Sequence, residues 1–189
     1  PVSAAGLAIV SDTQGMLRAY DPATGALRWT RDAGAPVYRT PAASGDLLLV
    51  PTTRGRLVAL EAASGDVRWE ARIDPIARWA TPAIADGAVY AGATDGTLRA
   101  YDSGTGEERW ARTFDGNIGG APLASGGFVF VGTYDKRIVA LDDETGAEVW
   151  SDELNGRVRA GIVAAGGTLV VLSEPRFIYG FRPEDLATR

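Results

Sequence analysis

The stretch that decides the fold is AYDPATGALRW, residues 19–29. Its pattern is Ala-x-Asp-x-x-Thr-Gly-x-x-x-Trp, and with small changes this pattern returns at residues 59–69, 100–110 and 140–150. A fifth, incomplete copy begins at Gly180. Four copies in register indicate an array of similar units, so the repeat has to be interpreted before any single residue.

Each full copy follows a proline that lies 28 residues before the tryptophan, at Pro1, Pro41, Pro82 and Pro122. Between these markers, apolar runs such as Leu47–Val50 alternate with turn signals such as Ser44-Gly45-Asp46. The period of two predicts four short strands in each unit of about 40 residues, joined by hairpin turns. The units expected are residues 1–36, 37–77, 78–117, 118–157 and 158–189.

The positions that recur in each copy of the pattern have separate physical roles. Asp21 can accept hydrogen bonds from peptide N–H groups two or three residues later. Gly25 is expected at positive φ, where a side chain is penalised. Ala19 is small enough to let another sheet approach closely. Trp29 is expected to lie between its own sheet and the next one, near the small alanine, as are its equivalents Trp69, Trp110 and Trp150.

Repeated four-stranded antiparallel sheets are typical of a β-propeller. The sequence therefore predicts an all-β fold, with one domain over residues 1–189 that contains four full blades and an incomplete fifth. In the fifth copy Glu184-Asp185-Leu186 replaces the Thr-Gly turn, and the tryptophan position falls beyond Arg189. We expect this blade to lack its outermost strand, and the innermost strand of the first blade to be cut short by Pro1. Such a chain is an arc of a larger ring, a small ring, or an arc completed by another copy.

Composition excludes several classes of function. The chain of 189 residues has no cysteine and no histidine, which removes disulfides, thiolate zinc sites and the commonest general base. A net charge of −5 argues against a nucleic-acid partner held by a basic surface. No apolar run is long enough for a membrane span. Because the chain begins with Pro1 rather than Met, we interpret it as a processed or excised piece.

Candidate binding residues lie just before the repeat prolines, where the sequence varies while the scaffold repeats. In a propeller this segment faces the central channel and one rim. Arginine and aromatic side chains around one mouth would suit an anionic ligand or an extended peptide. The alternative interpretation is that they are ordinary solvated arginines and aromatic residues of the core. The candidates are Tyr38, Arg39, Arg78, Trp79, Arg157 and Arg159. No catalytic residue, metal ligand or cofactor site is predicted.

The repeat resembles the tryptophan-docking repeat of the pyrroloquinoline-quinone (PQQ)-like propellers over nearly the whole chain. That family includes quinoprotein dehydrogenases, the lipoprotein propeller of the outer-membrane barrel-assembly machinery, and sensor domains of bacterial serine/threonine kinases. The repeat encodes packing rather than chemistry, so it predicts the fold better than the function.

The resemblance implies a non-catalytic scaffold or ligand-sensing module outside the cytoplasm, with a protein or peptide partner. Self-association that completes an open propeller is a further expectation. The alternative is a fragment of a PQQ-dependent dehydrogenase. Family enzymes of that kind are much longer and use calcium, a catalytic aspartate and often a vicinal disulfide, and this sequence offers no match for those features.

Overall fold

The structure is a computed structural model that describes residues 1–74 and 76–182. All elements of this part are β-strands, arranged in five antiparallel sheets, which confirms the predicted fold class. The first sheet contains β1 (Val2–Ala4), β2 (Leu7–Ser11), β3 (Met16–Tyr20) and β4 (Leu27–Asp32). The second contains β5 (Ala42–Ser44), β6 (Leu47–Pro51), β7 (Arg56–Glu61) and β8 (Val67–Arg72).

The third and fourth sheets repeat this up-and-down order, and in the fifth both β17 and β20 pair with β19. The third contains β9 (Ala83–Ala85), β10 (Ala88–Gly92), β11 (Thr97–Asp102) and β12 (Glu108–Thr113). The fourth contains β13 (Leu123–Ser125), β14 (Phe128–Gly132), β15 (Arg137–Asp142) and β16 (Glu148–Glu153). The fifth contains β17 (Arg157–Val158), β18 (Val163–Ala165), β19 (Thr168–Glu174) and β20 (Phe177–Phe181).

The turn between the third and fourth strands of a blade is fixed by its aspartate. One carboxylate oxygen of Asp21 accepts hydrogen bonds from the peptide N–H groups of Ala23 (2.9 Å) and Thr24 (3.1 Å). The other accepts from the Arg28 guanidinium at 2.6 Å. Gly25 closes the turn with a φ of 71°. The sequence pattern therefore encodes a tight hairpin that returns the chain toward the tryptophan.

The tryptophan of each of the first three blades docks on the turn of the next blade. The Trp69 indole N–H donates to the carbonyl of Ser103 at 2.9 Å, and a Cβ on Gly106 would lie 2.6 Å from the indole ring. Trp29 docks in the same way on Ala62 and Gly65, and Trp110 docks on Asp143 and Gly146. Each copy of the pattern thus contains both a tryptophan that packs on the next blade and a turn that can accept the tryptophan of the previous blade.

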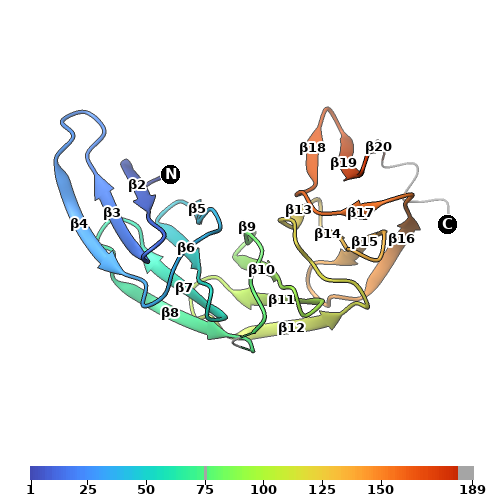
Figure 1. Cartoon of the computed structure of the whole chain (residues 1–189), viewed down its shortest axis with the longest axis horizontal. Coiled ribbons are helices and arrows are strands. Elements are labelled where there is room, and N and C mark those ends of the chain that lie inside the picture. Colours follow the sequence, from blue (N-terminus) through green and yellow to red (C-terminus); the bar gives the residue numbers. More distant parts are fainter. Residues whose placement is uncertain (75, 183–189) are drawn as a thin grey trace.

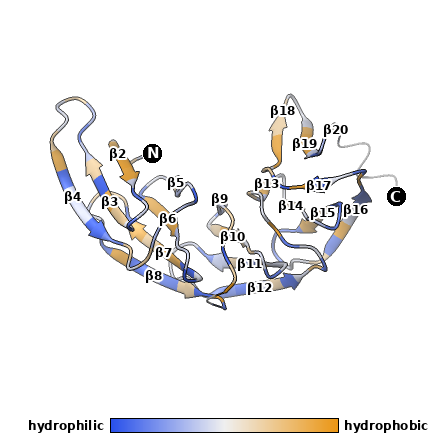
Figure 2. Ribbon diagram, viewed as in Figure 1, coloured by the Kyte–Doolittle hydropathy of each residue, from blue (hydrophilic) through white to orange (hydrophobic). Residues whose placement is uncertain are grey.

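The hydrophobic core is divided into layers between neighbouring sheets. The layer between the first two blades buries Ile9 and Leu17 of one blade against Leu48, Val50 and Leu60 of the other. Figure 2 shows the resulting distribution, with hydrophobic residues along strands such as β2 and β6 and many hydrophilic ones on the outer strands β4, β8, β12 and β16. No blade can bury both faces alone, so each depends on its neighbours.

The blades follow one another around an open arc, with β4, β8, β12 and β16 along its convex side and the two end blades apart (Figure 1). Contrary to expectation, the first inner strand is not cut short, because β1 has three residues like β5, β9 and β13. In the described part of the fifth blade, the short β17 pairs with the end of β19 and no outermost strand follows β20. The altered turn at residues 184–186 lies outside the described residues.

Candidate functional site

The candidate residues lie on one face of the arc, where two kinds of segment meet. One kind is the connector between the last strand of a blade and the first strand of the next. The other is the turn between the second and third strands, which lies on the same side because hairpin strands alternate in direction. We call this side the connector face. The two segments are joined by hydrogen bonds from the peptide N–H groups of Thr53, Thr94 and Tyr134 to the carbonyls of Pro36, Arg78 and Asn117, at 3.0, 2.9 and 3.0 Å.

These hydrogen bonds define which connector positions are equivalent. Pro36, Arg78 and Asn117 correspond to one another, and the residue after each is buried: Val37, Trp79 and Ile118. Counting three residues back from Pro41 and Pro82 would pair Trp79 with Tyr38 instead. Arg78 lies four residues before Pro82, whereas Pro36 and Asn117 lie five residues before their prolines, so counting from the proline misplaces the residues of this connector by one position.

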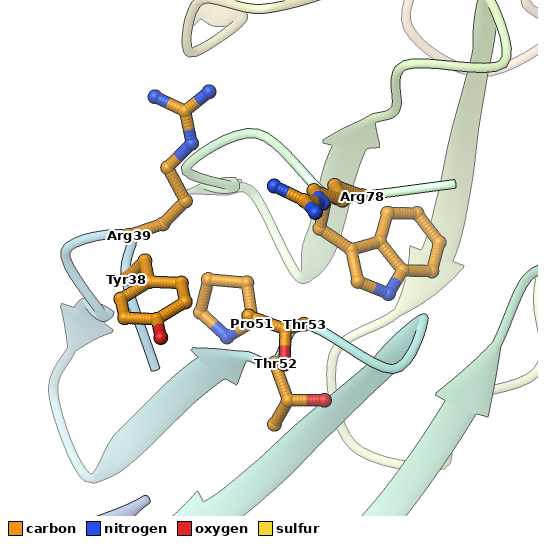
Figure 3. A pocket seen from close by; sticks show the side chains of 7 residues that line it. Tyr38, Arg39, Pro51, Thr52, Thr53 and Arg78 are labelled. Atoms are coloured by element: carbon orange, nitrogen blue, oxygen red, sulfur yellow. The ribbon is translucent and has the colours of Figure 1, made fainter. Parts of the chain in front are cut away.

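A pocket of about 280 Å³ opens on the connector face over the turn that follows β6. Figure 3 shows Tyr38 and Arg39 from the first connector on one side and Arg78 from the second on the other, with the turn residues between them. Tyr38 is 64% exposed, whereas Trp79 is 1% exposed and donates its indole N–H to the carbonyl of Gly55 at 3.0 Å. Trp79 therefore forms a wall of the pocket rather than a free anchor. The other lining residues are Pro51, Thr52 and Thr53.

The pocket is electropositive. Within residues 1–74 and 76–182, Arg39 and Arg78 have no carboxylate within ion-pair distance, and the same holds for Arg54 on the neighbouring turn. Most other arginines on the described blades are paired, as Arg56 is with Glu70. An exposed cluster of unpaired guanidinium groups beside an aromatic ring is suited to an anionic partner.

The structure does not bring all six candidates to one mouth. Arg157 lines a separate hollow beside Asp115 and Asp135, on the far part of the arc. Arg159 pairs with Glu174 at 3.3 Å, and its guanidinium lies over the Tyr134 ring at 5.3 Å. The two ends of the arc lie apart (Figure 1), so these two arginines are distant from Tyr38 and Arg39. The candidate site therefore consists of Tyr38, Arg39, Arg78 and the wall provided by Trp79.

Sequence reasoning missed the turn residues that form the floor. Pro51, Thr52 and Thr53 were not among the predicted site residues. The Thr52 hydroxyl donates to the carbonyl of Arg56 at 3.1 Å, so it stiffens the turn. Strand alternation was the available signal, because it puts every second turn on the side of the connectors.

The described residues offer no metal centre. In residues 1–74 and 76–182, no three acidic side chains lie close enough together to hold a metal ion, and the sequence has no histidine or cysteine. Nor does this part contain a helix of the length and apolar character needed to cross a membrane.

The fold and its docked tryptophans define a β-propeller built of PQQ-like repeats. The sequence matches the family model described as outer membrane protein assembly factor BamB, over residues 13–115 and 95–188. The chain belongs to this family. No curated protein sequence matches it.

Solved structures agree with that assignment. The chain is similar to BamB from Moraxella catarrhalis, with 26% identity and a TM-score of 0.83 over 100% of this chain. It spans 57% of the length of that BamB chain. Two computationally designed proteins share the fold alone. Ika4 matches at 19% identity and a TM-score of 0.68, over 75% of this chain and 88% of its own. Ika8 matches at 15% identity and a TM-score of 0.69, over 96% of this chain and 69% of its own.

Proposed function

We propose that this chain is a non-catalytic protein-interaction module that acts outside the cytoplasm and binds its partner through the connector face. One observation carries the proposal: Tyr38, Arg39 and Arg78 are exposed around an open pocket with no ion-pair partner in the described part of the chain. Family membership supports it, since the matching family is named for a factor in outer membrane protein assembly. A component of such an assembly is therefore the partner we propose first, and a ligand-sensing role would use the same face.

The residue types around the pocket are those that contribute most to protein interfaces. Tyrosine and arginine are enriched among residues whose removal costs an interface the most, and they act best near a pocket that excludes water. Tyr38 presents a large surface that loses little conformational entropy on binding. The buried Trp79 and the hydrogen-bonded Thr52 give these side chains a rigid support.

The alternative function, part of a PQQ-dependent dehydrogenase, has weaker support. Enzymes of that kind use calcium, and the described residues contain no cluster of three acidic side chains that could hold such an ion. We therefore derive no catalytic step for this chain.

Site-specific photo-cross-linking in cells of the source organism tests the proposal. Tyr38 is replaced by benzoylphenylalanine, and Val149 on the convex β16 is replaced in a control, since its side chain is also exposed. We expect light-dependent protein adducts of defined mass at position 38 and not at position 149. Adducts at 149 alone, or at neither position, would contradict the proposed interface.

We further propose that two copies of this chain pair through their end blades. Ile178 on β20 is 74% exposed, although its equivalents Leu17, Leu57, Leu98 and Ile138 are all 0% exposed between blades. Leu172 and Val163 are exposed on the same end blade. The first blade offers the complementary kind of face, because Ala8 and Val10 are only half-buried where Leu48 and Val50 are fully buried.

Sedimentation velocity over a range of concentrations tests this pairing. We expect the wild-type chain to show a concentration-dependent species larger than 19.8 kDa. Ile178→Asp is expected to shift the population toward monomer, because it puts a charge into an apolar contact. Val149→Asp, on the convex side, is the control and is expected to leave the distribution unchanged. A wild-type chain that stays monomeric at every concentration would overturn the pairing.

A further inference from the structure

The fourth blade shows what occupies the equivalent of the open pocket elsewhere in the molecule. Tyr134 stands at the position of Thr53, as their hydrogen bonds to Asn117 and Pro36 show. Its ring lies against Gly119, where a Cβ would come within 2.4 Å of the hydroxyl, and beneath the guanidinium of Arg159. In the fourth blade the Tyr134 side chain thus occupies the space that corresponds to the pocket over Thr53.

The fifth blade shows a second way in which the same turn position meets a connector arginine. Glu174 is equivalent to Tyr134 and Thr53, because β17 pairs Arg157 with Glu174 as Asn117 pairs with Tyr134. The Glu174 carboxylate lies 3.3 Å from Arg159 Nε. In this blade the turn residue Glu174 is therefore the ion-pair partner of the connector residue Arg159.

The second blade has neither arrangement. Thr53 is too short to fill the pocket or to reach a guanidinium, and its hydroxyl has no hydrogen-bond partner in the described part of the chain. Arg39 and Arg78 flank the pocket from opposite connectors, as Figure 3 shows. The pocket therefore holds two guanidinium groups and a free hydroxyl, and none of its lining residues is a carboxylate.

We propose that this pocket binds the carboxylate of an aspartate or glutamate side chain from an extended segment of a protein partner. The proposal rests on the proposed protein-binding function and names the chemistry of its partner. Arg39 and Arg78 hold the carboxylate oxygens, and the Thr53 hydroxyl can donate a further hydrogen bond. A guanidinium offers paired N–H groups that match a carboxylate, which makes such contacts stronger than neutral ones. Tyr38 covers the backbone of the segment beside the acidic residue.

The test follows the backbone amides of Thr53 and Arg78 by ¹⁵N NMR of the full chain. The probes are Ac-Ala-Glu-Ala-NH₂, its isosteric glutamine counterpart, and inorganic phosphate. We expect the glutamate peptide to bind at least about tenfold more tightly than the glutamine peptide, the size expected for hydrogen bonds to a charged group. Equal binding of the two peptides would overturn the proposal. Tighter binding of phosphate at the same amides would assign the pocket to a free anion instead.

Three variants locate the binding. Arg78→Gln is expected to weaken the glutamate peptide at least about tenfold, to the level of the glutamine peptide. Thr53→Tyr is expected to abolish binding by filling the pocket, as Tyr134 fills its equivalent, without changing any charge. Arg72→Gln, on the exposed end of β8, is the matched control and leaves binding unchanged. Unaltered amide shifts in the other blades verify that each variant is folded.

The outcomes separate this inference from the proposed function. If the glutamate peptide does not bind but position 38 still cross-links to a protein, the carboxylate assignment is wrong and the interaction module stands. If the Thr53→Tyr variant still binds the glutamate peptide as the wild type does, the peptide binds elsewhere on the chain and the inference fails.

Discussion

At the scale of single residues, the repeat aspartate is the position where local chemistry is most evident. The Arg28 guanidinium, together with the peptide N–H groups of Thr24 and Ala23, lowers the pKa of Asp21 from 3.8 to about 2. Arg109, with the peptide N–H groups of Thr105 and Gly104, lowers the pKa of Asp102 to about 2 as well. The turn thus favours the ionised carboxylate. The stability of each hairpin therefore depends on whether its aspartate is ionised.

This link predicts an acid dependence of stability. The folded chain keeps Asp21 ionised at pH values where the unfolded chain has bound a proton, so its contribution is complete above about pH 4 and is lost as the pH falls toward about 2. We expect the urea midpoint of unfolding to fall over that range, and to fall less steeply in Asp21→Asn/Asp102→Asn. If the urea midpoint changed equally with pH in the variant and the wild type, the ionisation of these two aspartates would not contribute to the acid dependence of stability.

At the scale of elements, the docking of a tryptophan on the next blade's glycine explains why the pattern repeats as a unit. Trp69 contacts Gly106 while its indole N–H reaches Ser103, so one residue uses both an apolar face and a donor. The tryptophan of the last full blade differs. Trp150 packs edge-on against Phe181 with ring centroids 5.2 Å apart, and its indole N–H has no partner within the described residues. Regular docking therefore extends from the first blade to the fourth.

Two glycines at the same turn position separate the contributions of backbone and packing. Gly25 and Gly106 have φ values of 71° and 76°, but a Cβ on Gly25 meets nothing within 4 Å, whereas one on Gly106 would overlap Trp69. Gly25→Ala is expected to cost about 1–2 kcal/mol, from the left-handed backbone alone. Gly106→Ala is expected to cost about 2–5 kcal/mol, because overpacking adds to that strain. Urea unfolding measures both, and equal losses would contradict the docking.

The elements were largely predictable from the sequence, whereas the candidate site was predictable only in part. Turn chemistry and a period of two are local signals, so they located the strands and the hairpins. The pocket depends on which side chain of a neighbouring turn fills the space, Thr53 in one blade and Tyr134 in another, and that is a contact between distant residues. Trp79 was a candidate binding residue with a core position as the alternative, and only the packing of its connector decides for the core.

At the scale of the whole molecule, the open arc separates residues that a closed ring would gather. Arg39 and Arg78 remain together because adjacent connectors carry them, while Arg157 and Arg159 lie at the far end of the arc. The sequence predicted the number of blades but not this separation, since the spacing of repeats does not specify how far the chain curves. A binding site on such an arc is therefore expected between neighbouring blades rather than across a central channel.

We propose that this propeller arc is a binding module rather than part of a quinone enzyme. Thermal unfolding with added PQQ and calcium chloride tests it most directly, because a ligand that binds the native state raises its stability. A quinone present at about 100 times its Kd would contribute about 2.7 kcal/mol, or about 5–10 °C in Tm for a chain of this size. We expect no change in Tm at micromolar quinone. A saturable rise in Tm that requires both quinone and calcium would contradict the claim.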